Sequence, residues 1–119
     1  MSSILVIDDD PAAAKLLELA LGRVGHQVDV ARDLSSGQRA ARSGHHDLMI
    51  LDVFMPDGSG LDLLRYLRGE LGSTVPVLVL TGHRQEEFLA RAQEAGATGY
   101  VTKPFSVRDL LAEVARLTG

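Results

Sequence analysis

Short apolar segments alternate with helix patterns along the whole chain, and this alternation limits the fold more than any other feature. Four of the segments occupy residues 4–7, 48–51, 77–80 and 99–102, and a fifth, at residues 26–31, alternates apolar and polar side chains as an edge strand does. Strands that alternate with helices pair in parallel through right-handed crossovers, and continuously apolar strands need cover on both faces. The sequence therefore predicts an α/β fold, a three-layer doubly wound sandwich.

Helix signals fill the intervals between the strands. Asp10 is a predicted N-cap with Pro11 at the first helical position, and Gly25 is the predicted stop of that helix. The other expected helices cover residues 33–43, 61–71, 84–95 and 106–117. A unit of five strands and five helices favours the flavodoxin-like strand order 2-1-3-4-5, which places the first and third strands side by side where the winding reverses.

Polar residues stand at the ends of four predicted strands. Asp8 and Asp9 follow the first strand, Asp52 ends the third, and Thr81 and Lys103 end the fourth and fifth. The carboxyl ends of parallel strands meet at one edge of a sheet, so these side chains are expected in one crevice. Clustered carboxylates repel one another unless a cation or a lysine neutralises them, and Mg²⁺ prefers such oxygens while keeping positions open for phosphate. A carboxylate in such a site can attack phosphorus.

Taken singly, each of these residues has an ordinary structural interpretation. The run Asp8–Asp10 before Pro11 is typical of a solvated helix cap, and Asp52 could cap the following loop. Thr81 and Lys103, each taken alone, are typical surface residues. Their occurrence together at four strand ends favours a functional site.

Two other groups of residues invite a functional interpretation that the sequence does not support. The adjacent pair His45-His46 lacks a matched third metal ligand and is interpreted as part of a loop. Four arginines at helical positions are interpreted as solvated helix faces: Arg39, Arg42, Arg65 and Arg68.

Composition narrows the class of protein further. The 119 residues suit a single domain, 1–119, and a net charge of −4 argues against nucleic-acid binding by this segment, which would need a basic patch. The absence of cysteine excludes a disulfide scaffold and a thiolate metal site. The apolar runs are far too short to span a membrane and there is no signal-peptide pattern, so we expect a cytoplasmic location and no membrane contact.

Four motifs carry a resemblance to a known family. They are Val6–Asp10, Leu51–Gly60, Leu80–Gly82 and Gly99–Phe105, in that order. With these motifs the chain resembles, over essentially its whole length, the CheY-like receiver domains of response regulators in bacterial two-component signalling. The loop after Asp52 and the Pro11 helix start are similar to receivers at the N-terminus of NtrC-type transcription activators.

The resemblance implies roles for the acidic residues. Asp52 would accept a phosphoryl group from a sensor histidine kinase, a phosphotransfer protein or a small phosphodonor. Asp9, Asp52 and the backbone carbonyl of Phe54 would bind Mg²⁺ (or Mn²⁺) directly, and Asp8 would act through water. Lys103 would pair with the phosphorylated side chain, and its bond to Pro104 is expected to be cis.

The resemblance also implies a switch. Thr81 would bind the phosphoryl oxygens and move toward them, and Tyr100 would then rotate inward and change the face formed by the fourth helix, fifth strand and fifth helix. Phe54 stands where many relatives carry a polar residue, which predicts slow self-dephosphorylation, and His83 is the other expected rim residue. The output stays open between a transcriptional effector domain and direct binding of a partner protein, and a homodimer through the same face is compatible with the family.

Two alternatives remain at this stage. A haloacid-dehalogenase-like aspartyl-phosphate phosphatase would use Asp8-x-Asp10 after the first strand, but that family carries a cap domain that 119 residues hardly accommodate, and the Lys103-Pro104 position does not belong to it. A receiver that works only through protein contact would lack some of the site residues, all of which are present here. The favoured function is a phosphoacceptor switch, which is not a turnover enzyme.

Overall fold

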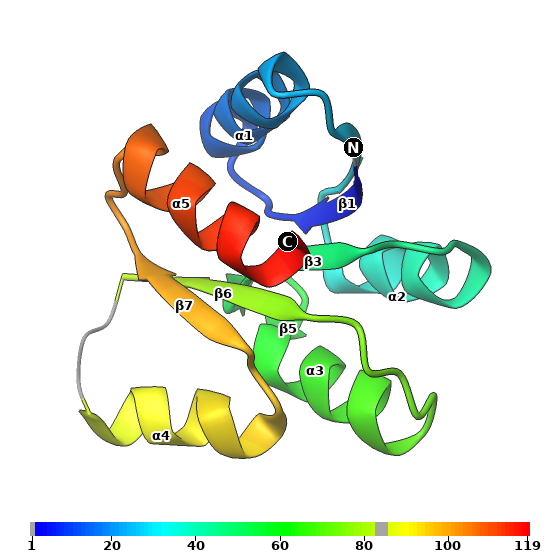
Figure 1. Ribbon diagram of the computed structural model, residues 1–119. Coiled ribbons are helices and arrows are strands. Elements are labelled where there is room, and N and C mark those ends of the chain that lie inside the picture. Colours follow the sequence, from blue (N-terminus) through cyan, green and yellow to red (C-terminus); the bar gives the residue numbers. More distant parts are fainter. Residues whose placement is uncertain (1, 83–85) are drawn as a thin grey trace.

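The computed structural model describes residues 2–82 and 86–119 and contains a parallel sheet between two layers of helices (Figure 1). The sheet consists of β1 (Ser3–Ile7), β2 (Gln27–Ala31), β3 (Leu48–Asp52), β6 (Val77–Thr81) and β7 (Gly99–Thr102). The helices are α1 (Pro11–Arg23), α2 (Leu34–Ser43), α3 (Gly60–Gly69), α4 (Glu86–Ala95) and α5 (Val107–Thr118). A small hairpin of β4 (Phe54–Met55) and β5 (Gly58–Ser59) lies between β3 and α3.

The order of the strands confirms the predicted topology. The 5-stranded sheet runs β2-β1-β3-β6-β7, and all four pairings are parallel. Ile7 of β1 is level with Leu51 of β3, and Asp52 is level with Leu80 of β6. The carboxyl ends of these central strands therefore meet at one edge of the sheet, which brings the residues after β1 next to the end of β3.

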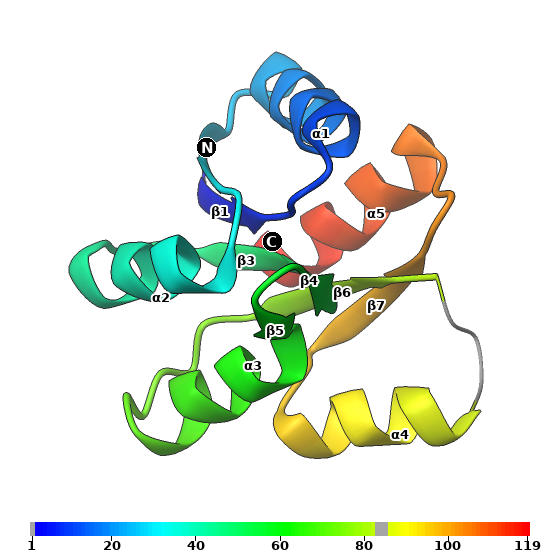
Figure 2. The same ribbon diagram turned by 180° about the vertical axis from the view of Figure 1, so that it is seen from behind.

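Apolar side chains fill both faces of the sheet. Leu17 of α1 and Leu110 of α5 pack with the residues of one sheet face, whereas Leu64 of α3 and Ala92 of α4 pack with those of the other. The two ribbon views agree: α1 and α5 cover one face, and α2, α3 and α4 cover the opposite face (Figures 1 and 2). The predicted three-layer arrangement is confirmed, and β2 is an edge strand with exposed and half-buried residues in alternation.

Local signals set several helix ends where the sequence predicts them. The Asp10 side chain accepts a hydrogen bond from the backbone N–H of Ala12, and Pro11 opens α1. Gly25 adopts a φ of 94° just after α1, a left-handed conformation that glycine reaches without steric cost. Asp33 and Ser106 cap α2 and α5 through the N–H groups three residues on.

Several expectations about the elements are wrong in detail. Residues 55–60, expected to be a loop, contain most of the antiparallel hairpin β4–β5 and the first residue of α3. The third helix ends at Gly69 rather than residue 71, because the chain turns through Gly72 at a φ of 61° and leaves Leu71 exposed. The start of the fourth helix at Arg84 lies outside the described residues.

The prediction that four arginines lie on solvated helix faces is wrong for Arg68. Its half-buried guanidinium donates hydrogen bonds to the carbonyl of Gly96, at 3.1 and 2.9 Å, and to the carbonyl of Ser73, at 3.0 Å. Burial lowers the pKa of Arg68 from its usual value. Arg68 therefore ties α3 to the residue that follows α4.

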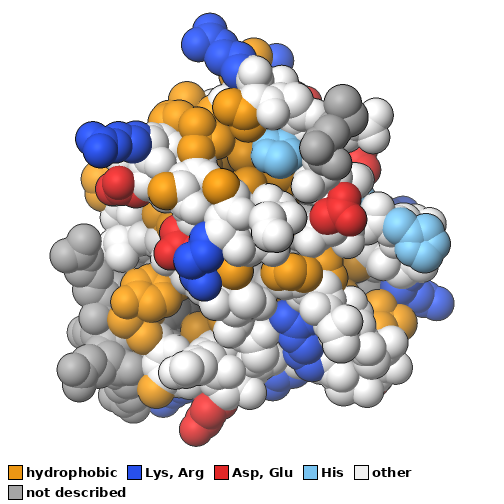
Figure 3. All heavy atoms as spheres, viewed as in Figure 1, with side chains coloured by type: hydrophobic (Ala, Val, Ile, Leu, Met, Phe, Trp, Pro, Cys, Tyr) orange, Lys and Arg blue, Asp and Glu red, His pale blue; other side chains and the backbone are white. Residues whose placement is uncertain are grey.

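On the face shown in Figure 3, the lysine and arginine side chains are scattered among acidic, apolar and uncharged ones rather than gathered in one basic patch. In the part of the chain that the structure describes, each helix is too short or too polar to cross a membrane.

Candidate functional site

Three carboxylates lie together at the carboxyl edge of the sheet. Asp8, Asp9 and Asp52 each offer an oxygen within 4.8 Å of the others. Asp8 is fully buried, Asp52 is 7% exposed, and Asp9 is exposed to solvent. The pairing of β1 with β3 produces this cluster, because it places the residues at the ends of these two strands beside one another.

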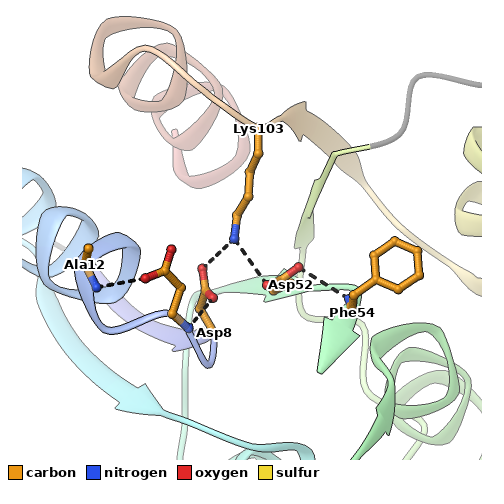
Figure 4. A network of polar contacts seen from close by, with 6 residues as sticks. Asp8, Ala12, Asp52, Phe54 and Lys103 are labelled. Carbon is orange, nitrogen blue, oxygen red and sulfur yellow. Dashed lines mark hydrogen bonds and ion pairs between the residues drawn. The ribbon is translucent and has the colours of Figure 1, made fainter. Parts of the chain in front are cut away.

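Lys103 bridges the two buried carboxylates. Its Nζ lies 3.0 Å from Oδ2 of Asp8 and 3.2 Å from Oδ2 of Asp52 (Figure 4). The side chain of Lys103 is 25% exposed, so the ammonium group approaches the carboxylates from the loop after β7 with limited access to water. The sequence prediction that Lys103 faces the aspartates at this edge agrees with these contacts.

Backbone N–H groups hold the remaining oxygens of the same carboxylates. Asp10 donates its N–H to Oδ1 of Asp8 at 3.0 Å, and Phe54 donates its N–H to Oδ1 of Asp52 at 3.4 Å. Phe54 is 56% exposed, and its aromatic ring points away from the cluster (Figure 4). Sequence analysis missed both donors. An Asp side chain at the start of a turn often accepts a hydrogen bond from the backbone N–H two residues later, and this pattern could have indicated them.

Thr81 ends β6 at the same edge of the sheet and is fully buried. Its backbone carbonyl accepts the N–H of Lys103 at 2.7 Å, which fixes the start of the loop that carries the ammonium group. The peptide bond between Lys103 and Pro104 is cis, as the resemblance implied.

The environment of the cluster changes two acid–base equilibria. Burial raises the pKa of Asp52 to about 6, and the charge of Asp8 adds to this effect while Lys103 opposes it. Burial alone would lower the pKa of Lys103, but the hydrogen bond to Asp8 and the charges of both carboxylates outweigh it and raise that pKa. The ammonium group therefore stays charged, whereas Asp52 holds its proton to a higher pH than an ordinary aspartate does.

The charges of the cluster fit a divalent cation. One ammonium group faces three carboxylates, which leaves two negative charges unbalanced when all of them are ionised. Among residues 2–82 and 86–119, this is the group of His, Cys, Asp or Glu side chains that is close enough to hold a metal ion. An all-oxygen donor set is compatible with Mg²⁺, which binds one or two carboxylates and keeps several waters.

Tyr100 and the histidines are not among the residues of this network that the structure describes. Tyr100 of β7 is 50% exposed and lines a cavity of about 620 Å³ with residues of α4 and α5. His83 lies outside the described residues. His46, from the histidine pair, is largely buried, with its side chain 6% exposed, and contacts a carboxylate oxygen of Asp29 at 3.0 Å.

Residues 4–115 match the model of the family described as "Response regulator receiver domain". The chain is 40% identical over 115 residues to the probable transcriptional regulatory protein TcrX of Mycobacterium tuberculosis, an alignment that covers 97% of this chain and 49% of TcrX. It is 41% identical over 114 residues to the transcriptional regulatory protein KdpE of the same species, covering 96% of this chain and 50% of KdpE. The chain thus spans about half the length of these relatives.

The fold also matches solved structures. A Francisella structure described as the response regulator 1452 receiver domain superposes with a TM-score of 0.94 at 28% sequence identity, covering 99% of this chain and 97% of that one. The agreement extends over nearly the full length of both chains, including the sheet edge that carries the acidic cluster.

Proposed function

The chain belongs to the response regulator receiver domain family, and we propose that residues 1–119 form a single receiver domain that accepts a phosphoryl group on Asp52 in a two-component phosphorelay. One observation carries this proposal: Lys103 bridges Asp8 and Asp52 beside Asp9, so a nearly buried carboxylate lies next to both a fixed positive charge and a pair of further carboxylates. This combination suits a nucleophile that must approach a phosphoryl group of the same sign of charge.

The proposed reaction is a displacement at phosphorus. A carboxylate oxygen of Asp52 forms the new O–P bond while the P–N bond to the histidine of a kinase or phosphotransfer protein breaks, and the imidazole leaves with the bonding electron pair. With a pKa of about 6, Asp52 is mostly ionised near neutral pH and is ready to attack. Lys103 would offset negative charge that develops on the phosphoryl group, and Thr81, at the neighbouring strand end, would donate its hydroxyl to a phosphoryl oxygen.

Asp9, Asp52 and the Phe54 carbonyl would hold a Mg²⁺ ion directly in this proposal, and Asp8 would hold it through water. The exposure of Asp9 and the full burial of Asp8 are consistent with such a division. When bound, Mg²⁺ supplies positive charge to the oxygens of the phosphoryl group in the transition state.

A labelling experiment separates this phosphoacceptor function from the phosphatase alternative. The protein is incubated with acetyl phosphate and Mg²⁺, and the modified residue is mapped by mass spectrometry. We expect one added phosphoryl group on Asp52 and none in an Asp52→Asn variant, whereas Asp62→Asn, at an exposed acid of α3, should still be labelled. Label on Asp8 with steady release of free phosphate would instead support a turnover enzyme.

The proposed signal is a change in the α4–β7–α5 face. Phosphorylation adds up to about two negative charges and new acceptor oxygens near Thr81, which would draw this hydroxyl inward and let Tyr100 leave its half-exposed position. Beryllofluoride in place of the phosphoryl group, followed by NMR of the amides of α4 and β7, tests the switch. Shifts confined to the acidic cluster would contradict it.

We place the output in a separate effector. The similar proteins TcrX and KdpE are described as transcriptional regulatory proteins and are about twice as long as this chain, so we propose that this domain controls transcription through an attached DNA-binding segment. The net charge of −4 argues against DNA contact by the domain itself. Its proposed partners are a cytoplasmic sensor kinase or phosphotransfer protein and a second copy of the chain through the α4–β7–α5 face.

A further inference from the structure

The turn of the β4–β5 hairpin is tied to the start of α2. The carboxylate of Asp57, in this turn, accepts the backbone N–H of Leu34 at 2.9 Å and that of Ser35 at 3.2 Å. Leu34 and Ser35 are the first two residues of α2, and the hairpin lies beside this end of the helix in the view from behind (Figure 2). A residue 22 to 23 positions away in the sequence therefore caps this helix.

This contact completes the hydrogen bonding of the first turn of α2. The N–H of Ser36 donates to Oδ1 of Asp33 at 2.7 Å, and the N–H of Gly37 donates to the carbonyl of Asp33 at 3.0 Å. Without Asp57, the N–H groups of Leu34 and Ser35 would turn to water. The helix has no acidic residue in its own first turn, so Asp57 is also a negative charge that its N-terminal dipole attracts.

The other end of the hairpin is tied to the acidic cluster. The N–H of Phe54 donates to Asp52 at 3.4 Å, and the N–H of Gly60 donates to the carbonyl of Val53 at 2.7 Å. Phe54 pairs with Ser59 across the hairpin. The backbone of Phe54 is thus held between Asp52 and a turn that is itself anchored on α2.

We propose, building on the function proposed above, that Asp57 is a positioning residue for the metal and phosphoryl site. By fastening the hairpin to α2, it keeps the N–H of Phe54 directed at Asp52 and holds in place the backbone that carries the Phe54 carbonyl, the proposed metal ligand. Asp57 acts only through the hairpin.

Because the hairpin is small, a tether of this kind contributes to keeping it seated. Each strand has two residues, and a hairpin of this length has little stability of its own in water. The tether is solvent-exposed, so its effect is that of a surface helix cap, about a fivefold change in the equilibrium between the seated and released hairpin. Only the seated hairpin is competent to bind, so the apparent Kd for Mg²⁺ rises as the seated fraction falls.

The test compares Asp57→Ala with Asp62→Ala in the intact chain. Both variants remove one negative charge from neighbouring segments, and Asp62 contacts only the exposed Arg65, at 3.1 Å, among the interactions described for it. Mg²⁺ is titrated into unphosphorylated protein and the Kd is measured from amide shifts in NMR spectra. We expect the Kd of Asp57→Ala to rise, with about fivefold as the upper limit, reached when the released hairpin predominates, and that of Asp62→Ala to stay at the wild-type value. Asp57→Asn, which keeps one acceptor oxygen, should fall between wild type and Asp57→Ala.

A second measurement distinguishes positioning from general stabilisation. In wild type, the Leu34 and Ser35 amides should shift when Mg²⁺ binds, because the hairpin links them to the site; in Asp57→Ala they should not respond. Equal Kd values for folded Asp57→Ala and Asp62→Ala, or wild-type Leu34 and Ser35 amides that ignore Mg²⁺, would overturn the inference. If Asp57→Ala does not fold, the wild-type shifts and Asp57→Asn still decide. Wild type that neither binds Mg²⁺ nor takes label on Asp52 would instead contradict the proposed function.

Discussion

Replacing the proposed acceptor by its neutral isostere should make the metal-free protein more stable. Asp52 is 7% exposed and shares Lys103 with the fully buried Asp8. The negative charge of Asp52 is therefore largely removed from water, and only part of this loss of hydration is compensated by Lys103. The amide side chain of an Asp52→Asn variant has nearly the same shape without the charge. We therefore expect the variant to unfold at a higher urea concentration than wild type when EDTA removes divalent cations.

The size of the effect follows from the pKa of Asp52. A rise from the ordinary 3.8 to about 6 corresponds to a free energy of about 3 kcal/mol against the ionised form in the folded state. Part of this is not recovered, because the variant must accommodate an amide NH₂ group near the Lys103 ammonium, which lies 3.2 Å from the carboxylate in wild type. A gain of about 2 kcal/mol in the free energy of unfolding at pH 7 is the expected result.

The pH dependence of stability tests separately whether Asp52→Asn stabilises the protein. Between about pH 4 and pH 6, Asp52 is ionised in the unfolded chain but still protonated in the folded one, so unfolding releases a proton. This group therefore removes stability from wild type as the pH rises through that window. The amide that replaces it in the variant does not titrate. The advantage of Asp52→Asn should be small near pH 4 and complete above about pH 6.5.

Urea unfolding followed by far-UV circular dichroism, in EDTA and at several pH values, measures both quantities. Asp62→Asn is the matched control. The carboxylate of Asp62 is exposed, so this substitution should change the unfolding free energy by less than about 0.5 kcal/mol. An Asp52→Asn variant that is less stable than wild type at pH 7, or an advantage that does not vary with pH, would refute the reasoning from buried charge.

Three further predictions concern the metal, the hairpin and the fold. Mg²⁺ at ten times its Kd should raise the free energy of unfolding of wild type by about 1.4 kcal/mol in the same urea assay, and Asp9→Ala should lose most of this gain; equal gains would remove Asp9 from the ligand set. Phe54→Asn should shorten the lifetime of the phosphorylated protein severalfold, measured as phosphate release after donor removal, because a polar side chain at the rim can orient water; an unchanged lifetime would contradict this. Arg68→Met should cost about 2 kcal/mol of stability, since two half-buried carbonyls lose their charged donor, whereas Arg65→Met should cost less than about 0.5 kcal/mol; similar losses would show that the Arg68 contacts contribute little.

The elements of the main sheet and the helix caps could be predicted because their signals are local. Continuous apolar runs define strands that are covered on both faces, and Asp10, Asp33 and Ser106 precede helices as capping residues do. The β4–β5 hairpin escaped prediction because two residues per strand produce no periodicity. Helical spacing continues through Leu71, but the left-handed turn at Gly72 ends the helix first.

In the candidate site too, some residues could be predicted from the sequence and others could not. Asp8, Asp9, Asp52, Thr81 and Lys103 could be predicted at one edge because parallel topology alone brings strand ends together. The side chains that support this arrangement could not be predicted, because each acts through contacts between segments that are remote in the sequence.

Asp57 is of a residue type that is common in turns, and its carboxylate gains a role only because α2 lies beside the hairpin. Arg68 has the spacing of a solvated helix face, yet its guanidinium reaches Gly96 beyond α4. In both cases a charged side chain satisfies backbone groups at a helix end on another segment, which sequence periodicity cannot indicate. Because exposed and half-buried contacts of this kind are individually weak, they can hold a loop or helix in one arrangement and still release it when a phosphoryl group changes the local charge.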